Sequence, residues 1–134
     1  MKALLFERDL HAEVAALARA HVGALVVLPV PLVGFDIQAC ARVLQFTNGC
    51  NASRSRAAVD RELLAARKAE QRAVEGVHGA SLLDPENQLC STDRCSTEVD
   101  GVDLYSDDTH LTFAGALRLT PSFVRAISAA GGRR

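Results

Sequence analysis

The sequence predicts an α/β fold in which helices cover a small, mostly parallel sheet. Two short apolar runs, residues 24–28 and 77–83, indicate buried strands. Each run follows a longer segment with helical periodicity, and such alternation of helix and strand is typical of layered α/β proteins with right-handed crossovers. With only two such strands and one small hairpin, the predicted sheet is thin.

The first helix is expected over residues 7–20, where apolar side chains return to one face at helical spacing. Gly23 is a suitable C-cap for this helix. The strand at 24–28 follows at once, and its β-branched composition suits burial on both faces. Pro29 ends the strand because proline cannot donate to a sheet ladder.

A long irregular stretch separates this strand from a second helix, expected over residues 57–75. Val59 and Leu63 should face inward, while charged residues occupy the outer face. Gly76 is expected to end the helix, and the second buried strand, 77–83, follows it.

The last part of the chain predicts a hairpin and a closing helix. An Asp-Gly pair at 100–101 lies between short alternating segments, which is a strong hairpin signal. Thr112 is a suitable N-cap for the closing helix. A Thr-Pro pair at 120–121 should interrupt or restart that helix, because proline suits the first helical position after a threonine cap.

The composition indicates a single globular unit without an affinity for polyanions. Fifteen basic and sixteen acidic side chains leave no strong field, so nucleic acid is not an expected partner. There is no Trp and only one Tyr, which disfavours a self-sufficient carbohydrate-binding module with exposed stacking rings. The aromatic side chains are expected to pack in the core: Phe6, Phe35, Phe46, Tyr105, Phe113 and Phe123.

No membrane span and no signal peptide are expected. The longest apolar run, residues 24–33, is about half the roughly twenty residues that a spanning helix needs, and it contains two prolines. The N-terminal apolar residues are broken by three charged residues at 7–9, too early for a secretory leader.

The four cysteines favour an oxidising compartment. Two local disulfides, Cys40 with Cys50 and Cys90 with Cys95, are the simplest of the three possible pairings. In a reducing compartment the same residues would be free thiols or, less favoured, a four-cysteine metal site. The spacing lacks the Cys-x-x-Cys pattern of structural zinc, so no metal is expected.

Basic side chains gather around the start of the second helix: Arg54, Arg56, Arg61, Arg67 and Lys68. They would suit a site for an anionic sugar, but a solvated helix face is the favoured interpretation.

The clearest candidate for chemistry is an Asp-x-x-His pattern near the last helix. Asp107 precedes His110 by three residues, so the carboxylate and the imidazole can meet across one tight turn. A histidine that removes a proton from a hydroxyl needs its other ring nitrogen held by a carboxylate. The same polar residues are also ordinary helix-capping residues, so the spacing alone leaves both interpretations open.

The final third of the sequence resembles the end of an SGNH-type hydrolase domain. The most specific resemblance is to the periplasmic SGNH domain fused behind membrane acyltransferases that O-acylate bacterial surface sugars. In that subgroup a Cys pair, a Leu-Tyr and an Asp-x-x-His-Leu-Ser/Thr-x-x-Gly-Ala block follow one another closely. The matching residues here are Asp84-Pro85, Leu89-Cys90, Cys95, Asp100-Gly101, Leu104-Tyr105, Asp107, His110-Leu111-Thr112 and Gly115-Ala116.

By this resemblance, Asp107 and His110 are the acid and base of a Ser-His-Asp relay. The fold implied is a partial three-layer α/β/α, flavodoxin-like domain with few parallel strands. The family's nucleophile lies in a Gly-Asp-Ser turn of the N-terminal half, and no Gly-Asp-Ser occurs in this sequence. Residues 1–134 are therefore expected to form a single partial domain without the nucleophile half. The serines considered as substitutes, none of them in a glycine-flanked strand-to-helix turn, are Ser81, Ser91, Ser96 and Ser106.

The resemblance implies the C-terminal portion of an O-acyltransferase or esterase domain acting on acyl groups of cell-surface carbohydrate in the periplasm. No metal or organic cofactor is implied. The expected partners are an acylated carbohydrate or acyl donor, an N-terminal half, and a membrane acyltransferase domain. The alternative is a truncated, non-catalytic remnant or an interaction module that pairs with another polypeptide.

Overall fold

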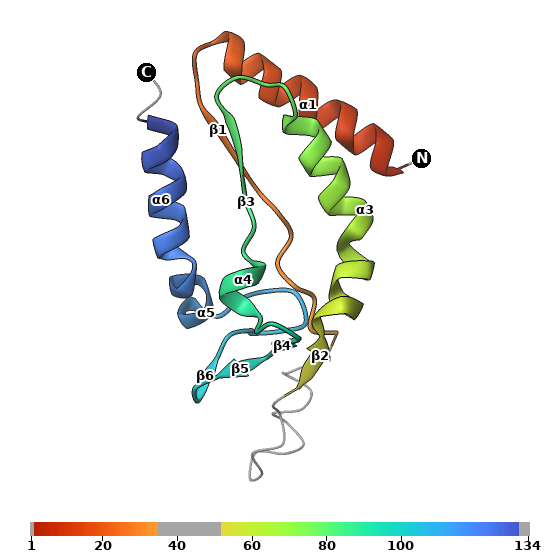
Figure 1. The fold of residues 1–134 in the computed structure, drawn as a ribbon, viewed down its shortest axis with the longest axis vertical. Helices are drawn as coiled ribbons and strands as arrows, with labels where there is room; N and C mark the ends of the chain where they lie inside the picture. Colours follow the sequence, from red (N-terminus) through yellow and green to blue (C-terminus); the bar gives the residue numbers. More distant parts are fainter. Residues whose placement is uncertain (1, 35–51, 132–134) are drawn as a thin grey trace. The chain divides into compact units, whose positions relative to one another are not determined.

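The computed structural model describes residues 2–34 and 52–131. Cys40 and Cys50, with their expected disulfide, lie outside the described residues, as do Phe35 and Phe46. The described helices and strands, shown in Figure 1, are α1 (Lys2–Arg19), β1 (Ala24–Val27), β2 (Ser53–Ser55), α3 (Arg56–Val74), β3 (Ala80–Leu83), α4 (Glu86–Leu89), β4 (Arg94–Ser96), β5 (Glu98–Val99), β6 (Val102–Asp103), α5 (Phe113–Arg118) and α6 (Thr120–Gly131).

The chain divides into two compact units. The first comprises Met1–Pro29, Leu63–Asp84 and Pro121–Arg134, and the second comprises Val30–Glu62 and Pro85–Thr120. Among the described residues, no helix is both long enough and apolar enough to span a membrane.

The first unit contains the parallel strand pair that the sequence predicts. β1 and β3 pair in parallel, with Ala24 opposite Ala80 and Val27 opposite Leu83. The Leu28 N–H donates to the Leu83 carbonyl at 2.9 Å and extends the pairing beyond the strands. Figure 1 shows this pair between α6 on one side and α1 with α3 on the other. The prediction of an α/β fold with parallel strands is confirmed.

The second strand is shorter than predicted because residues 77–79 form a turn. The Ala80 N–H donates back to the Val77 carbonyl at 3.2 Å, and Gly79 has a φ of 81°. Glycine adopts this left-handed conformation without a steric penalty, so β3 starts only at Ala80. Gly76, with a φ of 73°, follows the end of α3 as predicted.

The helix α1 starts earlier than predicted, at Lys2, because the residues before position 7 are good helix formers. Val14 is its buried side chain. Phe6 is 48% exposed, so the prediction that it packs in the core is wrong. Leu4 and Leu5 beside it are exposed as well, so the start of α1 presents apolar side chains to solvent.

The second unit is held by two antiparallel strand pairs. β2 pairs with β4, with Arg54 opposite Cys95. β5 and β6 form the predicted hairpin, and Asp100 and Gly101 at its turn have φ values of 55° and 74°. Two central residues with positive φ define a type I′ turn, which matches the twist of the strands. Leu104 follows β6 directly and is fully buried.

Aromatic burial in the second unit follows the prediction at one position and departs from it at another. Tyr105 is 1% exposed, whereas Phe113 is 81% exposed. Gly115, on the buried face of α5, lies against the backbone of Leu104. Residues two apart on a helix point to nearly opposite sides, so Phe113 faces solvent. The prediction of core packing is wrong for this side chain.

Candidate active site

A short loop in the second unit, Leu104 to Thr112, carries both predicted catalytic residues. At the ends of the loop, the Thr112 N–H donates a hydrogen bond to the Leu104 carbonyl at 2.9 Å. Nearer the tip, the Ser106 N–H donates to the His110 carbonyl at 2.8 Å. Between these bonds, Tyr105 and Leu111 form an antiparallel bridge. The backbone therefore draws the tip into one tight turn.

The loop is also attached to the helix that follows it. Thr112 is the N-cap of α5, and its hydroxyl accepts the Gly115 N–H at 2.9 Å while donating to the Asp103 carbonyl at 2.7 Å. One side chain thus joins the end of β6 to the start of α5. The N-cap predicted from the sequence is present.

Asp107 and His110 are in direct contact. His110 Nδ1 lies 2.8 Å from Asp107 Oδ2 and 3.0 Å from Oδ1. Oδ1 also accepts the backbone N–H groups of Thr109 at 2.8 Å and of His110 at 2.7 Å. The carboxylate is therefore oriented by the same turn that positions the ring.

The hydrogen bonds of the turn favour the charged form of Asp107. The Thr109 N–H contributes most and the His110 N–H next, and together they lower the pKa of Asp107 to about 2. An ionised carboxylate at Nδ1 favours the tautomer that carries its proton on Nδ1, which leaves Nε2 free to accept a proton. The His110 side chain is 76% exposed, so its ring is accessible to a reacting group.

Thr109 is a member of this cluster that the sequence pattern did not indicate. Its hydroxyl lies 3.2 Å from Asp107 Oδ1 and 3.1 Å from His110 Nδ1. The only signal in the sequence is its place directly before the histidine, which is also compatible with an ordinary capping residue.

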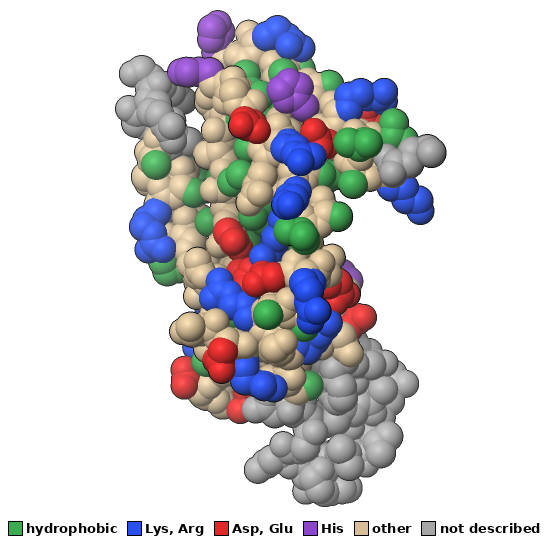
Figure 2. All heavy atoms as spheres, turned by 45° about the vertical axis from the view of Figure 1, so that its right-hand side comes forward, with side chains coloured by type: hydrophobic (Ala, Val, Ile, Leu, Met, Phe, Trp, Pro, Cys, Tyr) green, Lys and Arg blue, Asp and Glu red, His purple; other side chains and the backbone are tan. Residues whose placement is uncertain are grey.

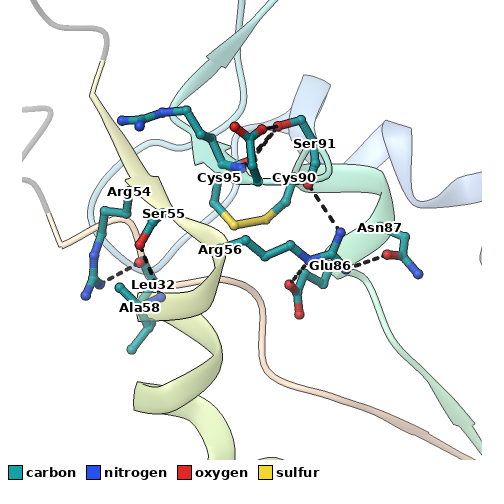
Figure 3. The surroundings of a disulfide bond; sticks show 12 residues. Leu32, Arg54, Ser55, Arg56, Ala58, Glu86, Asn87, Cys90, Ser91 and Cys95 are labelled. Atoms are coloured by element: carbon teal, nitrogen blue, oxygen red, sulfur yellow. Dashed lines mark hydrogen bonds and ion pairs between the residues drawn. A yellow bond between two sulfur atoms is a disulfide. The ribbon is translucent and has the colours of Figure 1, made fainter.

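A second polar cluster surrounds the disulfide that joins Cys90 and Cys95. Figure 3 shows Arg56, at the start of α3, reaching α4 and the loop after it. Its guanidinium pairs with Glu86 and donates to Asn87 Oδ1 at 2.6 Å. Glu86 is 1% exposed, and nothing in its sequence context distinguished it.

Two further members of the predicted basic cluster, Arg54 and Arg61, also bond to groups of the protein. Arg54 pairs with Glu62 at 2.8 Å and donates to the Leu32 carbonyl at 2.9 Å. Arg61 donates to the Ala57 carbonyl, one turn back on its own helix. On the face drawn in Figure 2, basic and acidic side chains are interspersed. The balance of charge in the sequence is thus also seen on this face.

The comparison with protein families identifies the chain. The model of the SGNH domain fused to AT3 domains matches residues 3–125. The chain belongs to this family. No curated protein and no solved structure matches it. The SGNH family indicates a function of the hydrolase or acyltransferase type, and its description notes fusion to AT3 domains.

In this SGNH chain three of the four serines considered as substitutes have hydroxyls with structural partners. Ser106 Oγ donates to the His110 carbonyl at 3.2 Å, and Ser91 Oγ to the Arg94 carbonyl at 3.1 Å. Ser81 Oγ, in the first unit, lies 3.5 Å from the Ala24 carbonyl. Within the described residues, the His110 ring bonds to Asp107 and Thr109 and to no serine.

Proposed function

We propose that these 134 residues are the C-terminal portion of a single SGNH domain that transfers or hydrolyses acyl groups on cell-surface carbohydrate. The observation that supports this proposal is the solvent-accessible His110 ring held at Nδ1 by an ionised Asp107, in a chain of the SGNH family. The nucleophilic serine is supplied from outside these residues, in the family's Gly-Asp-Ser turn. We call this chain together with that serine-bearing segment the complete domain.

The proposed relay divides acyl transfer into two steps. In the first, His110 Nε2 removes the proton of the serine hydroxyl as its oxygen attacks the acyl carbonyl, and then returns that proton to the departing alcohol. In the second, His110 deprotonates an acceptor hydroxyl or water as it attacks the acyl-enzyme, and then returns that proton to the departing serine oxygen. Asp107 remains ionised throughout, keeps the ring oriented and stabilises the imidazolium.

The family context supports an extracytoplasmic site of action. Fusion to AT3 domains fits a membrane acyltransferase as the source of the acyl group. The disulfide between Cys90 and Cys95 fits an oxidising compartment such as the periplasm. The proposed partners are therefore an acyl donor, an acylated carbohydrate and the membrane acyltransferase domain.

A serine-directed fluorophosphonate probe and an acetyl ester substrate test the proposal. The complete domain should be labelled by the probe and should hydrolyse or transfer the ester, while the 134-residue chain alone should do neither. His110→Ala should abolish both signals in the complete domain. His78→Ala is the matched control, because His78 is an exposed histidine that belongs to the first unit and not to the unit that carries the Asp107 loop. Equal activity in the two variants would refute the relay.

A second candidate function is non-catalytic pairing with another polypeptide. It is favoured by exposed apolar side chains of the first unit, namely Leu4, Leu5, Phe6, Val124 and Ile127. If the complete domain shows no serine labelling, yet the chain forms a stable complex with the separately produced serine-bearing segment, this alternative replaces the enzyme proposal.

A further inference from the structure

The disulfide of the second unit lies beside a buried carboxylate. Glu86 and the two sulfurs of Cys90 and Cys95 each offer a ligand atom, and these atoms all lie within 4.8 Å of one another. Cys95 is fully buried, and the Glu86 side chain is 2% exposed. We propose that, once this disulfide is reduced, the three side chains bind a thiophilic divalent cation of the zinc class.

The chemistry requires an external two-electron reductant, a dithiol or a phosphine. Reduction breaks the sulfur–sulfur bond, and the two sulfurs take up two protons to become thiols. Binding of the cation releases both protons to solvent, because the thiolate is the metal ligand. Two thiolates and one carboxylate are ligands that zinc accepts, and a water molecule completes a tetrahedral shell.

The loop between the cysteines is held without the disulfide, so the ligands stay together after reduction. The Ser91 N–H donates to the Arg94 carbonyl at 2.7 Å, and the Arg94 N–H donates to Ser91 Oγ at 3.1 Å. From outside the loop, the Arg56 N–H donates to the Asp93 carbonyl at 2.8 Å. A tetrahedral zinc ion needs sulfur ligands about 3.8 Å apart, and side-chain rotation provides this separation on a fixed backbone.

Arg56 gives the site a balanced charge. Its guanidinium pairs with Glu86 and donates to Asn87 Oδ1 and to the Ser91 carbonyl, which fixes the carboxylate next to the sulfurs (Figure 3). With the disulfide intact, the positive charge of Arg56 and the negative charge of Glu86 cancel. With a divalent cation bound, two thiolates and Glu86 balance the cation and Arg56, so the buried cluster stays neutral. A charged partner that orients a ligand is typical of metal sites.

Optical titration with Co²⁺ and Cd²⁺ tests the proposal without any activity measurement. The full chain carrying Cys40→Ser and Cys50→Ser is reduced with a phosphine, and the metal is added without oxygen. We expect one equivalent to produce a thiolate-to-metal charge-transfer band, and the oxidised chain to produce none. Glu86→Gln keeps an acceptor for Arg56 and should weaken binding by at least about tenfold. Cys95→Ser should weaken it further.

Asp93→Asn is the matched control, because Asp93 lies in the same loop but its carboxylate is not among the three ligands. Its affinity for the metal should equal that of the parent. Three outcomes would overturn the proposal: no charge-transfer band in the reduced chain, unchanged affinity in Glu86→Gln, or loss of the far-ultraviolet circular dichroism spectrum on reduction. The last would show that the loop does not persist without its disulfide.

Discussion

Gly115 lies so close to the backbone of Leu104 that a Cβ atom at position 115 would be 2.1 Å from the Leu104 carbonyl oxygen. This contact joins α5 to the first residue of the Asp107 loop. The same carbonyl accepts the Thr112 N–H that closes the loop. The glycine thus acts on the candidate site through the backbone of the loop.

Gly115→Ala should therefore destabilise the chain and disturb the loop. Backbone cannot move aside as a flexible side chain can, so we expect a loss of about 1–3 kcal/mol in the free energy of unfolding. Urea denaturation measures this loss, and nitrogen NMR of His110 Nδ1 reports whether its bond to Asp107 survives. Gly23→Ala is the control, because the nearest atom to its Cβ, the Gly79 carbonyl oxygen, is 3.6 Å away. An unaltered His110 signal in Gly115→Ala would contradict a positioning role.

Much of this arrangement could be predicted from the sequence because it is local. The Asp107 and His110 contact, the Thr112 cap and the hairpin turn at Asp100 each depend on residues within a few positions of one another. The close approach of Gly115 to Leu104 could not be predicted, since it depends on where α5 lies against β6 rather than on any pattern in the helix.

Pairing between distant segments was the other part that the sequence could not predict. β2 is a Ser-Arg-Ser segment without apolar alternation, and its pairing with β4 joins residues about forty positions apart. Glu86 was missed for a similar reason: its burial depends on Arg56, thirty positions earlier in the chain. A charged residue in a short polar helix carries no sign of such a partner.

Asp107→Asn should reduce acyl transfer by the complete domain by about 10³–10⁴-fold in kcat. Asparagine keeps an oxygen for the N–H groups of Thr109 and His110, so the turn survives, but it removes the charge that stabilises the imidazolium. The substrate KM should change little, because the carboxylate faces the ring and not the acyl group. Asp108→Asn is the adjacent control, and comparable loss in both variants would point to general damage to the loop.

The lowered pKa of Asp107 predicts how the folded state responds to acid. The folded pKa of about 2 lies below the ordinary value of 3.8, so the unfolded chain binds protons more readily in this interval. The contribution of Asp107 to stability is therefore fully present above the unfolded pKa and is lost as the pH falls through the folded one. A carbon-13 NMR titration of the Asp107 carboxyl should show a midpoint near 2, and a midpoint at the ordinary value would mean that the turn does not hold the carboxylate.

Removing the disulfide should cost less than breaking the ion pair beside it. The bridge closes a loop with a sequence separation of 5, for which loss of loop-closure entropy gives about 2 kcal/mol. Glu86→Ala leaves the Arg56 guanidinium, three-quarters buried, without its carboxylate, and such changes cost about 3–5 kcal/mol when both partners are fully buried. Because Arg56 is partly exposed, we expect the lower end of that range.

Urea unfolding of Cys90→Ser/Cys95→Ser and of Glu86→Ala, in the same buffer, gives the comparison. A double serine variant less stable than Glu86→Ala would show that the covalent bridge, and not the hydrogen bonds around Arg56, holds this loop, and the same result would weigh against a preformed metal site in the reduced chain.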